Sequence, residues 1–148
     1  MSIERVLGES APELMTCQPS DALLLAIDRL VDNNLNAIAV VDDERLAGIL
    51  TDHDIMRAMR KTRGKIDGER VDAWMTKDVI TCVPETKLTE ALRMMGQYRI
   101  RHLIVAIDDR PVALLGIRGI LARIHEHDEL EINVLRDMAI AARAAVTG

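Results

Sequence analysis

The sequence predicts an α/β fold made of two β-α-β-β-α repeats related by a pseudo-twofold axis, with small sheets packed against helices and a further C-terminal helix. When the chain of 148 residues is shifted by 65 residues, it matches itself in one frame without a gap. A duplicated unit implies two halves that share a core and form paired sites where they face each other. The identical pairs are Thr16/Thr81, Cys17/Cys82, Pro19/Pro84, Leu23/Leu88, Ala26/Ala91, Val40/Val105, Asp43/Asp108, Arg45/Arg110, Leu50/Leu115 and Ile55/Ile120.

The first elements of each copy are a short extended segment and a helix. The extended segment covers residues 14–17 in the first copy and 79–83 in the second, and each soon reaches a proline. Asp21 and Thr86 are predicted N-caps of the helix, because their side-chain oxygens can accept hydrogen bonds from unpaired backbone N–H groups. Apolar residues at helical spacing then predict the helix itself. They are Leu23, Leu24, Ile27, Leu30 and Val31 in the first copy, and Leu88, Ala91, Leu92 and Met95 in the second.

Two strands and a closing helix complete each copy. An apolar strand, a polar turn and a second strand are predicted in that order, and a helix then starts near Asp54 or Gly119. The strands are residues 38–41 and 46–51 in the first copy, and 103–107 and 112–115 in the second.

The domain boundaries follow from the repeat. We expect repeat 1 over residues 8–61, a linker over 62–72 that is polar and lacks periodicity, and repeat 2 over 73–125. A helical extension follows over 126–148, with one apolar stripe at three- and four-residue spacing. Packing of this helix onto its own domain and its use in a subunit contact are both open. The stripe consists of Leu135, Met138, Ala142 and Ala145.

Composition excludes several classes of protein. The net charge is −5, Phe is absent, and Trp74 and Tyr98 are the only aromatic residues, which argues against a nucleic-acid binder. No apolar run reaches the roughly 20 residues of a membrane helix, and the N-terminus lacks a signal-peptide pattern. We therefore expect a cytoplasmic protein without a membrane segment. Trp74 and Tyr98 are predicted to be packing residues.

The sequence offers no convincing catalytic or metal-binding set. Cys17 and Cys82 occupy equivalent positions and are predicted as small buried residues of equivalent strands, with a disulfide as the less favoured alternative. There is no CxxC motif and no serine nucleophile motif, and neighbouring residues such as Asp52 and His53 do not converge on one metal ion. We expect a protein that is not an enzyme and requires no cofactor.

A hydroxyl and a carboxylate are predicted where the second strand of the first copy meets its helix. Residues 48–55 read Gly-Ile-Leu-Thr-Asp-His-Asp-Ile, so the strand ends at Thr51 and the helix begins by Asp54. A carboxylate can accept hydrogen bonds from both hydroxyls of a ribose, and the N-terminus of a helix favours anions. A purely structural N-terminal cap at Asp54 accounts for the same residues.

Three segments together resemble the cystathionine-beta-synthase-type domain, or CBS domain, present as a stand-alone tandem pair. The segments are Trp74–Pro84, Tyr98–Val105 and Gly48–Ile55, and the resemblance covers roughly residues 10–125. It implies an adenosine-containing ligand, such as AMP, ADP, ATP or a related adenosyl compound, bound in a cleft between the repeats. It also implies a regulatory role, a homodimer and an effector protein that the sequence does not identify.

The resemblance also implies roles for individual residues. Thr51 and Asp54 of repeat 1 would hold ribose hydroxyls, and Arg101 and His102 of repeat 2 would meet the phosphate. Guanidinium and imidazole groups suit that task. The side chains expected to sandwich the base are Ile49 and Ile80.

The second composite site lacks all of these polar groups. Residues 113, 116 and 119 stand where the first site has Gly48, Thr51 and Asp54, and residues 36 and 37 stand where it has Arg101 and His102. We therefore expect one working site per chain. The alternative is a ligand-free module that dimerises or scaffolds a partner protein. The substituted residues are Ala113, Gly116, Gly119, Asn36 and Ala37.

Overall fold

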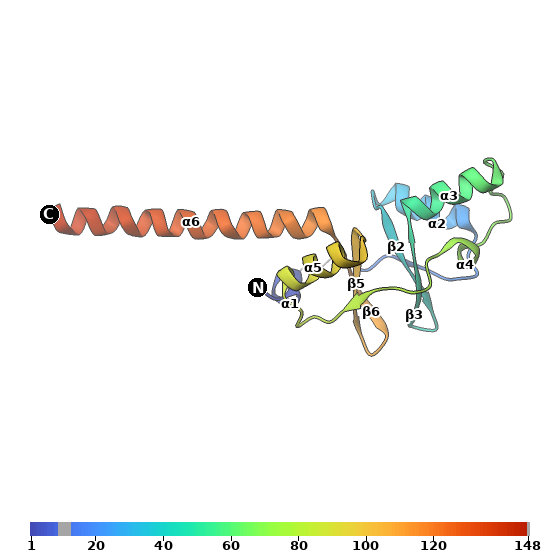
Figure 1. The fold of residues 1–148 in the computed structure, drawn as a ribbon, viewed down its shortest axis with the longest axis horizontal. Helices are drawn as coiled ribbons and strands as arrows, with labels where there is room; N and C mark the ends of the chain where they lie inside the picture. The colour runs from blue at the N-terminus through green and yellow to red at the C-terminus, as the bar shows by residue number, and fades with distance from the viewer. Residues whose placement is uncertain (9–12, 148) are drawn as a thin grey trace.

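The computed structural model (Figure 1) describes residues 1–8 and 13–147 and confirms the predicted α/β fold, with two three-stranded sheets packed with helices. In each sheet a short edge strand runs parallel to the central strand, which is antiparallel to the third. The first sheet comprises β1 (Thr16–Cys17), β2 (Ala37–Asp42) and β3 (Arg45–Thr51), and the second comprises β4 (Thr81–Cys82), β5 (His102–Ile107) and β6 (Arg110–Gly116).

The two sheets repeat each other residue by residue at the predicted offset. Ala37 lies opposite Thr51 at the end of the β2–β3 ladder, and His102 lies opposite Gly116 at the same place in β5–β6. Both ladders shift register at the same point, after Val40 and after its equivalent. The duplication in the sequence is therefore a duplication of backbone geometry.

In the part of the chain that the structure describes, four longer helices flank the sheets, and the predicted N-caps of two of them are wrong. The helices are α2 (Leu23–Asp32), α3 (Asp52–Thr62), α5 (Leu88–Tyr98) and α6 (Ile117–Thr147). Asp21 and Thr86 accept hydrogen bonds from the backbone N–H groups of residues 18 and 83 and so close turns before α2 and α5. The N-cap residues are Ala22 and Lys87, and neither makes a side-chain cap bond.

Carbonyl groups from elsewhere in the chain replace those caps. The N–H of Leu23 donates to the carbonyl of Glu69 at 2.8 Å, and the N–H of Leu88 donates to that of Met1 at 2.9 Å. Both acceptors lie just before short helices, α4 (Val71–Trp74) and α1 (Ile3–Leu7). Each repeat is thus closed by the segment that leads into the other repeat, and residues 71–72 of the predicted linker belong to α4.

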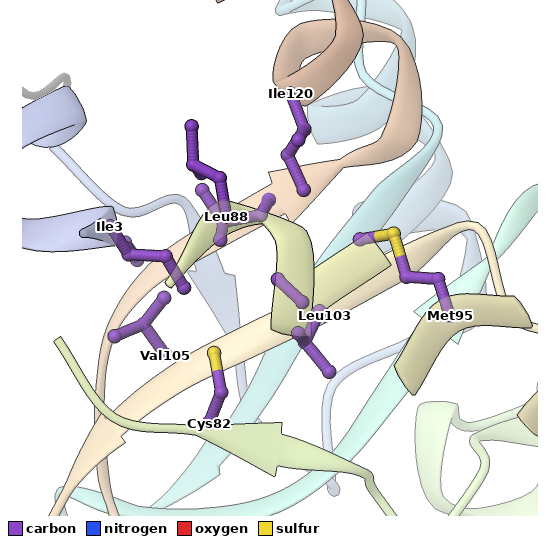
Figure 2. Close-up of a cluster of buried hydrophobic side chains, with 10 residues drawn as sticks. Ile3, Cys82, Leu88, Met95, Leu103, Val105 and Ile120 are labelled. Carbon is purple, nitrogen blue, oxygen red and sulfur yellow. The ribbon is translucent and has the colours of Figure 1, made fainter. Parts of the chain in front are cut away.

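Among the described residues, buried apolar side chains form three clusters. One lies in each repeat, and Figure 2 shows the second, in which Ile3 of α1 joins Leu88, Leu103 and Val105. The third lies between the sheets and contains Ala37, Ala39, Ile49 and Ile104.

The two cysteines are buried and free, in β1 and β4, as the preferred interpretation predicted. Burial raises the pKa of each thiol to about 11.

Trp74 packs against the first core, as expected. Tyr98 is 48% exposed at the end of α5, so its prediction as a packing residue is wrong.

The C-terminal half of α6 extends away from both sheets (Figure 1). The first turns pack against the second core through Ile117, Ile120 and Ile124. Of the two alternatives left open for this helix, packing of its apolar stripe onto its own domain is therefore wrong. Within the described ranges, no helix is both long and apolar enough to span a membrane. The large apolar side chains exposed beyond residue 130 are Ile132, Val134, Leu135, Met138 and Ile140.

Replacement of Gly48 by alanine should destabilise the protein. A Cβ atom there would lie 2.8 Å from the carbonyl oxygen of Thr76, which accepts a hydrogen bond from the N–H of Ile49. We expect Gly48→Ala to cost about 1–3 kcal/mol of unfolding free energy through overpacking. The same change at Gly96, in the interior of α5 with open space around it, should stabilise the protein by about 0.5–1 kcal/mol. Denaturant unfolding of both variants checks this, and a neutral Gly48→Ala would contradict it.

Candidate functional site

A cavity of about 390 Å³ lies between the two repeats and collects most of the predicted site residues. It brings together Ile49, Thr51, Asp54, Arg101 and His102. Ile80, the sixth predicted residue, packs instead against the second core. Among the described residues, those that line it are Ile49, Thr51, His53, Asp54, Thr76, Arg99, Ile100, Arg101 and His102.

The wall from repeat 1 is fixed by a capping box at the start of α3. The side chain of Thr51, the N-cap, accepts a hydrogen bond from the N–H of Asp54 at 3.3 Å. Asp54 Oδ2 in return accepts from the backbone N–H of Thr51 at 2.9 Å. Such reciprocal bonds satisfy two N–H groups that a helix start leaves unpaired. Thr51 and Asp54 therefore do form the structural cap that the sequence left open.

Asp54 makes further contacts through both carboxylate oxygens. Its side chain is buried, with only 3% of the residue exposed, and no other charged residue among the described ones is buried. Oδ2 also accepts from the Thr51 hydroxyl at 3.1 Å, and Oδ1 accepts from Arg57 Nη2 at 3.0 Å and from the Thr76 hydroxyl at 3.4 Å. A ligand hydroxyl could therefore reach this carboxylate by taking the place of one threonine hydroxyl. The Arg57 contact neutralises its charge.

The opposite wall carries positively charged groups from residues 99–102. Arg99 ends α5 with a left-handed backbone (φ 54°), which turns the chain toward β5. Arg101 Nη2 donates to Asp52 Oδ1 at 3.2 Å, so an exposed ion pair links the two repeats across the cavity.

His102 lies against the second sheet opposite Gly116, its partner across the ladder. A Cβ atom at Gly116 would meet the imidazole ring at 3.8 Å, an ordinary contact distance. Burial lowers the pKa of His102 below its usual value near 6.5, and the positive charge of Arg101 lowers it further, while Asp52 acts in the opposite direction. His102 is therefore neutral at pH 7 in the empty cavity.

The pseudo-symmetric cavity is smaller and mostly apolar. Its volume is about 150 Å³, and Ala37 and Ala113 line it at the positions that match His102 and Gly48. The part of its lining that the structure describes includes one charged residue, Glu13, and no cation. This cavity therefore cannot offer a phosphate the contacts that the larger one offers. Its lining residues are Leu7, Glu13, Leu14, Met15, Leu35, Ala37, Ala113 and Leu114.

Four lining residues, Arg99 among them, were not predicted as site residues. Ile100 could have been found, since its equivalent at the 65-residue offset is Leu35, which lines the second cavity. His53 lies inside the motif that predicted Thr51 and Asp54. Thr76 lies in the segment Trp74–Pro84 that carries the family resemblance, but a backbone bridge to Ile49, which the sequence does not reveal, brings it to the cavity.

The arrangement is suited to a ligand with hydroxyl groups at one end and an anion at the other. Threonine and carboxylate groups lie on one wall, and guanidinium and imidazole groups lie on the other. In residues 1–8 and 13–147 no three or more His, Cys, Asp or Glu side chains gather as a metal ion would require.

Comparison with known proteins places this geometry in one family. The family model for the CBS domain matches twice, at residues 7–61 and 70–126. The chain is 31% identical over 129 residues to the CBS domain-containing protein CBSX3, mitochondrial, of Arabidopsis thaliana. That alignment covers 82% of this chain and 63% of the relative, so the chain spans less than two thirds of the relative's length.

Two similar solved structures contain ligands. The CBS domain pair of protein MJ0100, in complex with 5′-methylthioadenosine and S-adenosyl-L-methionine, has a TM-score of 0.73 and 22% identity, and the match covers 84% of this chain and 99% of that one. CBSX2 in complex with AMP, a protein from Arabidopsis thaliana, has a TM-score of 0.67 and 23% identity, with 78% and 90% covered. The duplicated sequence, the paired sheets and the two matches to the family model agree: this chain belongs to the CBS domain family.

Proposed function

We propose that this chain is a regulatory, non-catalytic module that binds an adenosine-containing ligand in the cavity between its repeats, at one site per chain. The observation that carries the proposal is the placement of Thr51 and Asp54 on one wall and Arg101 and His102 on the other. The ligands named in the two similar complexes, AMP, 5′-methylthioadenosine and S-adenosyl-L-methionine, share the adenosine moiety.

Each part of such a ligand has a matching group. The ribose hydroxyls would replace the threonine hydroxyls on Asp54, and a phosphate would accept hydrogen bonds from Arg101 and His102. The apolar side chains of Ile49 and Ile100 would flank the base. The volume of about 390 Å³ falls in the range of small-molecule sites.

Regulation would follow from the position of the ligand between the repeats. A molecule that touches both walls binds best when the repeats adopt one particular orientation. It therefore shifts the population toward that orientation by its difference in affinity for the two arrangements. AMP, ADP, ATP and related adenosyl compounds are the candidate ligands. An effector protein would bind differently to the two orientations of the repeats.

The exposed apolar side of α6 favours a second role, a contact with another copy of the chain. Leu135 and Met138 are 59% and 62% exposed on a part of α6 that extends away from both sheets (Figure 1). Large apolar side chains that gather on an exposed face mark interaction surfaces. Homodimerisation through this face is compatible with ligand binding.

The cytoplasmic location stays a prediction, since the name of one relative describes a mitochondrial protein.

Loss of the Arg101 guanidinium should weaken AMP binding but not adenosine binding. We expect Arg101→Gln to lower AMP affinity about tenfold or more, because only the phosphate contacts this group. Isothermal titration calorimetry with AMP and adenosine measures both affinities. Arg110→Gln is the matched control, since Arg110 also forms an exposed ion pair between the repeats, with Glu44 at 3.5 Å. Equal AMP affinities in the two variants would rule out the phosphate role.

AMP affinity should rise as the pH falls from 8 to 6.5. The pKa of His102 is lowered in the empty cavity, and a bound phosphate would raise it by favouring the charged ring. Binding therefore takes up a proton, and affinity increases with decreasing pH until His102 is charged in the free protein as well. His102→Gln should flatten the profile, while the phosphate's own titration stays common to both proteins. Parallel profiles would refute a phosphate contact at His102.

Charge placed on the apolar face of α6 should break the dimer. We expect Leu135→Glu with Met138→Glu to give a monomer in light scattering, with AMP binding unchanged. Asn133→Glu, on the polar side of the same helix, should leave the dimer intact. A monomeric unsubstituted protein would contradict the dimer, and a dimer that survives the double substitution would place its interface elsewhere.

A further inference from the structure

Asp52 does not line the candidate cavity, but its carboxylate is paired with Arg101, which does, and the proposed function assigns it no role. Its Oδ1 accepts hydrogen bonds from the backbone N–H of His53 at 2.8 Å and from Arg101 Nη2 at 3.2 Å. The start of α3 already has a capping box from Thr51 and Asp54. The helix start therefore does not need Asp52 as a cap. The carboxylate of Asp52 instead pairs with the Arg101 guanidinium, which is the group that would hold a phosphate.

This ion pair is specific to one of the two pseudo-symmetric sites. The positions that match Asp52 and Arg101 are Ile117 and Asn36, which carry no charge. The backbone makes the same hydrogen bond at both sites. The N–H of residue 52 donates to the carbonyl of residue 36 at 2.9 Å, and the N–H of residue 117 donates to the carbonyl of residue 101 at 2.9 Å. Only the site that has phosphate partners has an acidic competitor for them.

The net charge of the side chains around the cavity is small once the ion pairs among them are taken into account. Arg57 neutralises Asp54 at 3.0 Å, and Asp52 engages Arg101. Arg99 lines the same cavity and adds one positive charge. A ligand with several phosphates would bring more negative charge than these cations balance, and it would place that charge beside the Asp52 carboxylate.

We propose that Asp52 selects ligands by charge: its carboxylate competes with the ligand phosphate for Arg101, so the site prefers an adenosyl compound with at most one phosphate over ATP. This inference rests on the proposed function and names its ligand class. Binding of a monophosphate exchanges one anion for another at Arg101. Each further phosphate adds repulsion from Asp52, and Arg99 is the one other guanidinium among the described lining residues that can offset it.

Calorimetry on the full chain with adenosine, AMP and ATP tests this inference through Asp52→Asn. Asparagine keeps an oxygen for the His53 N–H and removes only the charge. We expect the unsubstituted protein to bind AMP more tightly than ATP. The substitution should raise ATP affinity about tenfold, raise AMP affinity about two- to fivefold, and leave adenosine affinity unchanged. Asp137→Asn, the same change far along the exposed part of α6, should alter none of the three.

Two outcomes overturn the inference while leaving the proposed function intact. One is ATP binding tighter than AMP binding in the unsubstituted protein. The other is unchanged or lower ATP and AMP affinity in Asp52→Asn, which would make Asp52 a residue that positions Arg101 for the phosphate. If adenosine, AMP, ATP, 5′-methylthioadenosine and S-adenosyl-L-methionine all fail to bind the unsubstituted protein, both the proposed function and the role of Asp52 fail.

Discussion

The structure depends on the need to bury both faces of two small sheets. Along β2, Ile38 and Val40 belong to the core of repeat 1, while Ala37 and Ala39 belong to the cluster between the sheets. The second sheet divides its side chains in the same way, with Ile104 in the shared cluster. Each repeat covers one face with its own helices, and the other face can be buried only against the second repeat. The cavity lies beside this shared surface, where β3 and β5 bring their ends together.

The duplication made the sheets predictable, because an offset of 65 residues preserves strand pairing, bulges and turns. The short helices α1 and α4, each of which closes the other repeat, could not be predicted in this way. Ile3 and Val71, which occupy equivalent places, are 68 residues apart, so they fall outside the repeat frame. Helices of four or five residues also have no detectable periodicity. Their carbonyl groups at Met1 and Glu69 meet the first turns of α5 and α2, which is why the predicted side-chain caps were wrong.

The site was predictable in its residues but not in their contacts. The family resemblance pointed to both walls, whereas the contacts of Asp54 with Arg57 and Thr76 and the ion pair of Asp52 depend on tertiary geometry. The ladders also show part of the asymmetry between the cavities. Thr51 lies opposite a small residue, Ala37, and His102 lies opposite Gly116. Both larger side chains line the same cavity, whereas Ala37 lines its mate.

The stoichiometry of AMP binding to the full chain tests the central claim most directly, because the claim is that one of two pseudo-symmetric cavities works. Isothermal titration calorimetry should give one AMP per chain, with a single class of sites. Two AMP molecules per chain would show that the apolar cavity binds despite its lack of phosphate partners, and the charge asymmetry would then not determine function. No binding of AMP or any other adenosyl compound would contradict the account outright and favour the role of a scaffold.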